Sequence, residues 1–256
     1  MIQSVERAID IMMIISDNHG QPVTISEISN KLKLNQSTCC HIVETLVDKG
    51  FLNQVSRSAG YVLGVYAYNL TRYKDFHRDL ILTSMPILRW MQNKTGYTSL
   101  LASLIDSDKF VLCYSDNPDN PLSNRGDLYK GTLYDAATGR AMLSTLKPKE
   151  LKKLIIKVGL PKQEEWPDVD TYEKLQKELL KISKQKIVRA EFIENNKYIC
   201  KVSIPFLGPK QERFAIGLEI KKDKKPNKQE LDLVDKTIYT GTQEIIRRMK
   251  FENIGG

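Results

Sequence analysis

Four cysteines and three histidines are the residues of this 256-residue chain that best suit covalent or metal chemistry. Cys39, Cys40 and His41 are consecutive, and thiolate and imidazole groups bind zinc or form nucleophile–base pairs. Consecutive residues of a helix point about 100° apart, so these three side chains would not share one metal ion. Cys113 and Cys200 stand alone, without the spacing of metal ligands. We therefore predict no metal site, no cofactor and reduced thiols.

Short hydrogen-bonding side chains gather at the start of a predicted helix. Gln36, Ser37 and Thr38 follow Asn35 directly. Amide and hydroxyl groups at this end of a recognition helix suit base edges and phosphates, because that end enters the major groove of DNA. We therefore predict contacts with double-stranded DNA. The candidate contact residues are Thr24, Asn35, Gln36, Ser37, Thr38, Cys40, His41 and Arg57.

Two short helices joined by a tight turn are predicted to hold these groups. Thr24 and Glu27 have the spacing of a capping box at the start of the first helix. Asn35 suits the N-cap of the second helix, and Gly50 suits the left-handed residue that ends it. The predicted buried faces contain Ile25, Ile28, Leu32, Cys39, Ile42, Val43 and Leu46.

A third helix and a hairpin complete this predicted unit. Residues 4–16 have apolar side chains at helical spacing, and Ser4 suits the N-cap. Residues 51–54 and 60–63 are expected to form two short strands. The pattern predicts a winged helix-turn-helix domain over residues 1–65. A pair of helices followed by a β-hairpin, with no role in nucleic-acid binding, remains the alternative.

The order and spacing of these segments resemble the DNA-binding domain of the IclR-type (isocitrate lyase regulator) family of bacterial transcription regulators. Residues 138–143 and 200–205 resemble landmarks of that family's effector domain, so the resemblance covers nearly the whole chain. It implies an α+β fold with an N-terminal winged helix-turn-helix, a linker helix and a C-terminal GAF-like α/β effector-binding domain. The matching N-terminal segments are residues 4–11, 25–28, 36–38, 46–52 and 61–64.

Two departures from the family pattern remove positive charge from the predicted DNA-facing surface. Members of the family usually carry Lys where this chain has Gln36, and Arg where it has His41. Residues 1–75 contain seven Lys or Arg and seven Asp or Glu, so the formal charge of +8 belongs entirely to residues 76–256. The basic composition is therefore no sign of DNA binding here. We predict weak binding by a single domain and dependence on paired domains.

The middle of the chain is predicted to be helical. A linker helix is assigned to residues 66–78, and a second helix runs from about Asp79 to Lys94, with Pro86 at a restart or kink. The apolar face of the linker either packs on its own domain or pairs with another subunit. We predict a homodimer or a dimer of dimers, because paired subunits set the spacing of DNA half-sites.

Residues 79–256 are predicted to form the effector-binding and oligomerisation domain. By resemblance, the amides at the start of a helix near Asp135 hold a carboxylate, and a helix N-terminus is also an anion site on physical grounds. Plain helix packing is the alternative. Apolar side chains on the last strand predict a ligand more hydrophobic than a two- or three-carbon acid, such as an aromatic one. The candidate effector-binding residues are Ala136, Ala137, Thr138, Gly139, Glu191, Cys200, Leu218 and Ile220.

These patterns favour a regulator over an enzyme. The chain has no Gly-rich phosphate loop, no Gly-x-Ser-x-Gly turn and no apolar run as long as a membrane span. We predict a cytoplasmic DNA-binding regulator without catalytic residues, in which a small organic acid shifts operator affinity; activation and repression both stay open. A cysteine-dependent enzyme pairing Cys113 or Cys200 with His41 or His77 is one alternative, and a protein-interaction module is another.

Overall fold

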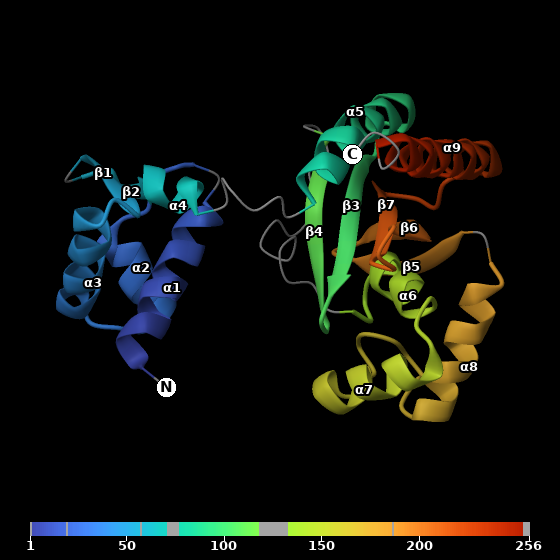
Figure 1. Cartoon of the computed structure of the whole chain (residues 1–256), viewed down its shortest axis with the longest axis horizontal. Coiled ribbons are helices and arrows are strands. Elements are labelled where there is room, and N and C mark those ends of the chain that lie inside the picture. The colour runs from blue at the N-terminus through green and yellow to red at the C-terminus, as the bar shows by residue number, and fades with distance from the viewer. Residues whose placement is uncertain are drawn as a thin grey trace. The chain divides into compact units, whose positions relative to one another are not determined.

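The computed structural model describes residues 2–18, 20–56, 58–70, 77–117, 133–185 and 187–252, without the side chains of residues 251 and 252. The chain divides into two compact units, residues 1–76 and residues 77–256 (Figure 1). Each unit has a hydrophobic core of its own. No helix among the described residues combines the length and the apolar character that crossing a membrane requires.

The first unit is a winged helix-turn-helix, as predicted. Its core joins buried side chains from three helices and from the first strand of the wing, among them Ile11, Ile28, Val43 and Leu52. The prediction that Ser4 caps the first helix is wrong, because the helix begins one residue earlier and its N-cap, Ile2, provides no side-chain hydrogen bond. The elements are α1 (Gln3–Ser16), α2 (Ile25–Leu32), α3 (Gln36–Asp48), β1 (Leu52–Ser56), β2 (Gly60–Leu63) and α4 (Val65–Asn69).

The predicted linker helix over residues 66–78 is described only in part. Helix α4 ends at Asn69, and residues 71–76 lie outside the described residues. Helix α5 (Arg78–Thr95) follows, and Gly96 ends it in a left-handed conformation with φ 74°. Helix α5 confirms the helix predicted from about Asp79 to Lys94. It continues through Pro86, so of the predicted restart or kink the restart does not occur. A proline removes one backbone hydrogen bond from a helix, which weakens α5 at this turn.

The second unit contains a five-stranded antiparallel sheet in the order β4-β3-β7-β6-β5. The long central pair β6–β7 is in register from Tyr198 opposite Lys222 to Leu207 opposite Arg213. Side chains alternate between the two faces of a strand, so each face has its own core. The strands are β3 (Thr98–Ile105), β4 (Asp108–Ser115), β5 (Val188–Glu194), β6 (Lys197–Leu207) and β7 (Arg213–Lys222).

Helices cover both faces of this sheet (Figure 1). Helices α5 and α9 (Lys228–Glu252) pack side by side on one face, over a core that includes Leu101, Val202 and Phe214. Helices α6 (Ala137–Leu143), α7 (Pro148–Val158) and α8 (Tyr172–Ser183) pack on the other core, with Ala102 and Ala215. The predicted α+β fold class is confirmed.

Candidate nucleic-acid interface and candidate ligand site

A capping box sets the start of α2. The Thr24 hydroxyl oxygen accepts a hydrogen bond from the Glu27 amide at 3.3 Å, and Glu27 Oε2 accepts from the Thr24 amide at 2.7 Å and from its hydroxyl at 2.8 Å. These bonds, the backbone one first, lower the pKa of Glu27. Thr24 was predicted both as a cap and as a DNA contact. The cap is confirmed. Within it the Thr24 hydroxyl both donates to the Glu27 carboxylate and accepts from the Glu27 amide.

The turn between α2 and α3 is three residues long and tightly bonded. Lys33 adopts a left-handed conformation with φ 52° and ends α2. The Leu34 amide then donates to the Ser29 carbonyl at 3.0 Å. Asn35 Oδ1 accepts from the Thr38 amide at 2.7 Å, which confirms Asn35 as the N-cap of α3. The direction of α3 is thus set by bonds at its first turn.

The end of α3 is a Schellman motif centred on Gly50, whose φ is 71°. The Gly50 amide donates to the Val47 carbonyl and the Phe51 amide donates to the Leu46 carbonyl, both at 2.8 Å. A Cβ atom at Gly50 would lie 2.4 Å from Tyr66 Cδ2, so the Tyr66 side chain of α4 packs directly against this turn. The predicted end of the recognition helix at Gly50 is confirmed.

One face of α3 is buried and the other carries the candidate DNA contacts. Cys39, Val43 and Leu46 belong to the core of the first unit. Gln36, Ser37 and His41 are exposed, and Thr38 and Cys40 are half-buried. Burial raises the pKa of the Cys39 thiol, so this cysteine stays protonated at neutral pH. The candidate hydrogen-bonding groups therefore lie on the surface, at the N-terminal half of the helix, as a major-groove reader requires.

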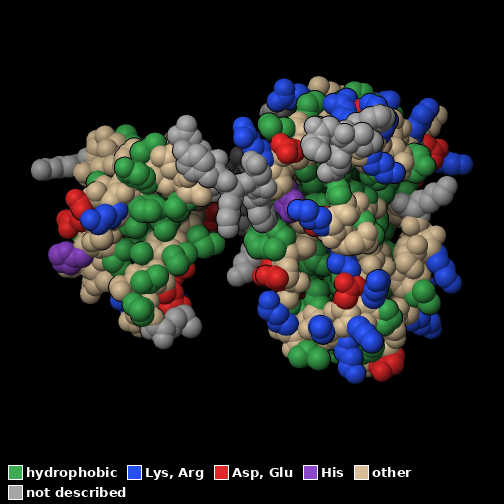
Figure 2. Space-filling model, in the orientation of Figure 1, with side chains coloured by type: hydrophobic (Ala, Val, Ile, Leu, Met, Phe, Trp, Pro, Cys, Tyr) green, Lys and Arg blue, Asp and Glu red, His purple; other side chains and the backbone are tan. Residues whose placement is uncertain are grey.

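The exposed face of α3 is polar and lacks cationic residues. The helix contains no Lys or Arg, and His41 Nδ1 lies 3.6 Å from Glu44 Oε2 on the exposed side. Residues 1–76 contain seven basic and seven acidic side chains, and most of the Lys and Arg visible in Figure 2 lie on the second unit. This face therefore presents hydrogen-bonding groups rather than positive charge.

The wing is tied to the segment before α2. The Val23 amide donates to the Tyr61 carbonyl and the Tyr61 amide donates to the Val23 carbonyl, both at 2.9 Å. Gly60 has φ 100°, and a Cβ atom there would lie 2.3 Å from the Val23 carbonyl oxygen. In the wing turn, the Ala59 amide donates to the Ser56 hydroxyl at 2.9 Å. Arg57, the candidate contact in this turn, lies outside the described residues.

The candidate effector-binding residues lie on two different faces of the sheet. Thr138 packs against the central strand, because a Cβ atom at Gly217 would lie 2.9 Å from Thr138 Cγ2. Cys200, Leu218 and Ile220 instead belong to the core under α5 and α9. Ala136, Ala137 and Gly139 are buried at the start of α6, with Thr138. The structure therefore does not bring all eight candidates together on one face, since alternation places Leu218 and Ile220 away from α6.

Glu191 also belongs away from α6. It pairs across the sheet with Cys200 in register, so the two side chains share a face. Its carboxylate forms an ion pair with Lys225 at 2.9 Å, and the Tyr198 side chain, followed by Lys225, lowers its pKa. Glu191 is thus engaged by polar neighbours on its own face of the sheet, and its geometry does not indicate a role in binding an effector.

Arg140 is a cation near the start of α6 that the sequence analysis did not single out. Its Nε donates to the Tyr134 carbonyl at 2.6 Å and its Nη2 donates to the Glu165 carbonyl at 2.9 Å. The guanidinium lies 4.3 Å from the centre of the Trp166 ring. Burial lowers its pKa to about 10, so it remains charged at neutral pH. These bonds show that Arg140 holds neighbouring segments together. The spacing of apolar residues along the helix does not predict this role.

The cysteine–histidine alternative finds little support. Burial raises the pKa of Cys113 to about 12 and that of Cys200 to about 11, so both thiols are protonated at neutral pH. His77, expected in the linker region, is the first residue of the second unit and packs edge-on against Phe214 at 5.0 Å. Within the described ranges, no group of three His, Cys, Asp or Glu side chains could hold a metal ion.

A family model and a curated relative both relate this chain to IclR. Residues 4–56 match the model of the IclR helix-turn-helix domain. The chain is 25% identical over 161 residues to the transcriptional repressor IclR of Escherichia coli K12, covering 62% of this chain and 58% of that protein. The matched region thus spans somewhat less than two thirds of that curated relative.

Solved structures of similar fold cover nearly the whole chain. An IclR homologue from Microbacterium hydrocarbonoxydans in complex with 4-hydroxybenzoate has a TM-score of 0.70 and 16% identity, covering 95% of this chain and 99% of that one. IclR of Thermotoga maritima has a TM-score of 0.64 and 19% identity, covering 97% and 99%. At these identities the structural similarity shows the fold alone.

Proposed function

We propose that this chain, which belongs to the IclR family, is a transcription regulator that reads operator DNA with α3. The observation that carries the proposal is the exposure of Gln36 and Ser37 at the first turn of a helix held by the Asn35 cap. Amide and hydroxyl side chains there can reach base edges in the major groove. The E. coli relative is a repressor by name, and we propose repression for this chain as well.

We propose that the active form is a homodimer or a dimer of dimers. A single neutral reading domain releases few counterions from DNA, so two domains acting together would supply the affinity that one lacks. In this proposal residues 1–65 read DNA, residues 66–78 link the units, and residues 79–256 bind effector and oligomerise. The protein would act in the cytoplasm, where its DNA is and where its free cysteines stay reduced.

We further propose a small organic acid as effector. The homologue from M. hydrocarbonoxydans was solved with 4-hydroxybenzoate, which supports an aromatic acid as the class to test first. An acid shifts operator affinity only by as much as its own affinity differs between the DNA-bound and the free arrangement of the protein. Enzymatic activity is not part of the proposal, because the buried thiols lack the low pKa that a cysteine nucleophile needs.

A mobility-shift titration tests this function. The full chain is mixed with DNA from upstream of its own gene, and with scrambled DNA of the same length, over a range of salt concentrations. We expect a shift of the upstream DNA and a salt slope shallower than about −8, because few phosphate contacts come from a reading domain without net charge. Equal binding to both DNAs, or none, would contradict the proposal.

A further inference from the structure

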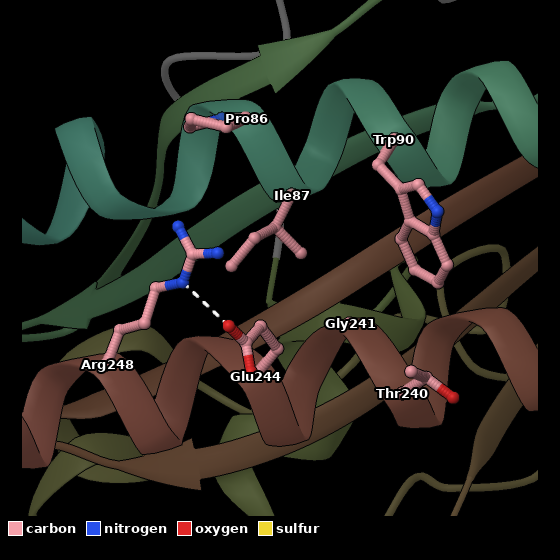
Figure 3. Close-up of a pocket in the computed structure, with 7 residues that line it drawn as sticks. All are labelled: Pro86, Ile87, Trp90, Thr240, Gly241, Glu244 and Arg248. Carbon is pink, nitrogen blue, oxygen red and sulfur yellow. Dashed lines mark hydrogen bonds and ion pairs between the residues drawn. The ribbon is translucent and has the colours of Figure 1, made fainter.

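A hollow of about 410 Å³ opens between α5 and α9 on the side of these helices that faces away from the sheet (Figure 3). Ligand sites in proteins span roughly 300–1,000 Å³ and are mostly apolar with a few polar groups, so this hollow has the size for a small molecule. It shares no residue with the start of α6. Its lining residues are Pro86, Ile87, Trp90, Thr240, Gly241, Glu244 and Arg248.

Apolar side chains from α5 form one wall of the hollow. The Trp90 ring extends from α5 toward α9 beside Thr240 and Gly241 (Figure 3). Trp90 is 39% exposed, although a large aromatic side chain gains stability by burial. The two helices approach closely at Gly241, where a Cβ atom would lie 2.5 Å from Met91 Sδ. The hollow lies beside this close approach, and the Trp90 ring lines it. Lys94 Nζ lies 5.0 Å from the centre of the same ring and adds a second cation near the aromatic wall.

A cation stands at the other end. Arg248 Nε donates to Glu244 Oε1 at 2.8 Å, and its two terminal nitrogens point toward α5 on the side of Pro86 and Ile87 (Figure 3). Glu244 also accepts two hydrogen bonds from Arg247, each of 2.7 Å. Hydrogen bonds from both arginines lower the pKa of Glu244 to about 2. Two guanidinium groups thus share one carboxylate, and the terminal nitrogens of Arg248 are the cationic groups at this end of the hollow.

We infer that this hollow binds a small aromatic monocarboxylate, with its ring against Trp90 and Ile87 and its carboxylate on the terminal nitrogens of Arg248. A guanidinium matches a carboxylate in shape and charge, and an indole face matches an aromatic ring. The inference deepens the proposed function and rests on it for the role of the acid as effector, while binding itself does not depend on DNA.

The position of the hollow in the chain gives such a ligand a route to the reading domain. Helix α5 begins at Arg78, directly after the residues that join the two units in sequence. Pro86 lines the hollow and leaves the Leu82 carbonyl without its helical partner, so α5 lacks one backbone hydrogen bond at the turn that the acid would touch. A ligand between α5 and α9 would therefore act on the helix nearest to the linker.

Tryptophan fluorescence reports on the site directly, because the chain contains only Trp90 and Trp166. In a Trp166→Phe variant of the full chain, emission comes from Trp90 alone. We expect saturable quenching by benzoate and none by benzamide, which has the same shape without the charge. A Trp90→Phe variant, in which the buried Trp166 remains, is expected to show no response. Quenching of Trp166 in place of Trp90 would overturn the inference.

Calorimetry with benzoate, on full chains that keep both tryptophans, compares the contributions of Arg248 and Arg247 to binding. Arg248→Gln is expected to weaken binding about tenfold or more, the loss of a charge-assisted bond. Arg247→Gln removes the same charge from the next residue, which does not line the hollow, and is expected to weaken binding clearly less than Arg248→Gln does. Glu244→Gln removes the competing carboxylate and is expected to bind more tightly. Equal affinity in the Arg248 and Arg247 variants would overturn the site.

The two proposals fail separately. A chain that shifts its upstream DNA but gives no benzoate signal at Trp90 keeps the proposed function and loses this site. A chain that binds benzoate at Trp90 but shifts no DNA keeps the site and loses the function. Self-association through the same surface, seen as a change of mass in light scattering between wild type and Trp90→Phe without any benzoate binding, would also refute the small-acid assignment.

Discussion

Replacing Gly60 by alanine should detach the wing from the recognition unit. The residue has φ 100°, a region that alanine rarely adopts, and the added Cβ would lie 2.3 Å from the Val23 carbonyl oxygen and 2.8 Å from the Thr24 amide nitrogen. Contacts this short to backbone atoms cannot be relieved by a side-chain rotation. The Val23–Tyr61 pair of hydrogen bonds, each 2.9 Å long, must therefore open.

The expected loss of stability is the sum of two contributions. A non-glycine residue in a left-handed conformation costs about 1–2 kcal/mol. Two backbone hydrogen bonds contribute about 0.5–1.5 kcal/mol each. Gly60→Ala should therefore destabilise the first unit by about 2–5 kcal/mol. Gly20→Ala is the matched control, because Gly20 has φ 78° with nothing within 4 Å of a Cβ, and it should cost only the conformational part.

Urea unfolding of the full chain, followed by circular dichroism, would measure both variants. The transition of the first unit is expected to move to lower urea in Gly60→Ala than in Gly20→Ala, while that of the second unit stays in place in both. Because the wing is tied to the start of α2, DNA binding should weaken in Gly60→Ala as well. Equal destabilisation by the two substitutions would refute the argument from the close approach of Gly60 to Val23.

Three further outcomes are expected. Asn35→Ala removes the bond to the Thr38 amide (2.7 Å) and should destabilise the first unit by about 1 kcal/mol in the same urea experiment, whereas Asn53→Ala on the exposed wing strand should have almost no effect. Cys113 and Cys200 should resist alkylation by iodoacetamide at pH 7 in the folded protein, since burial raises their pKa to about 12 and about 11, and Cys40 should be labelled first; prompt labelling of Cys200 in mass spectrometry would count against its burial. Burial lowers the pKa of His77 from 6.5, so the folded state binds fewer protons than the unfolded state below that pH, and the thermal midpoint of the second unit should fall as pH drops from 7 to 5; in His77→Asn this fall should be smaller, and an unchanged pH dependence would refute the assignment.

Local signals in the sequence predicted the first unit well, because its elements are bounded by short-range bonds. The caps at Thr24 and Asn35 and the left-handed end at Gly50 depend only on residues within one turn of the helix. The predicted cap at Ser4 is wrong, because a helix can begin without a side-chain cap. The apolar stripe of α1 does not mark the first residue of the helix either. Pro86 likewise does not end α5, because packing on the sheet and on α9 compensates for one missing hydrogen bond.

Long-range arrangement was harder to predict. The alternation of Ile216, Leu218 and Ile220 identifies a strand, but it is silent on which helices cover which face, and these three residues pack under α5 and α9. The hollow beside Trp90 joins residues 86–90 to residues 240–248, and nothing in the sequence pairs those two segments. The relation between α5 and α9 follows from the sheet order, in which β3 and β7, strands distant in sequence, are neighbours.

The specificity ratio of the recognition helix tests the central claim most directly. Fluorescence anisotropy would give the affinity for upstream DNA divided by that for scrambled DNA, in wild type and in the double variant Gln36→Ala/Ser37→Ala. The control is Gln3→Ala/Ser4→Ala, which removes the same two side chains from the same first positions of α1. Sequence-specific reading by α3 requires that the ratio falls toward one only in the α3 variant. An unchanged ratio in that variant, or an equal fall in the α1 control, would contradict it.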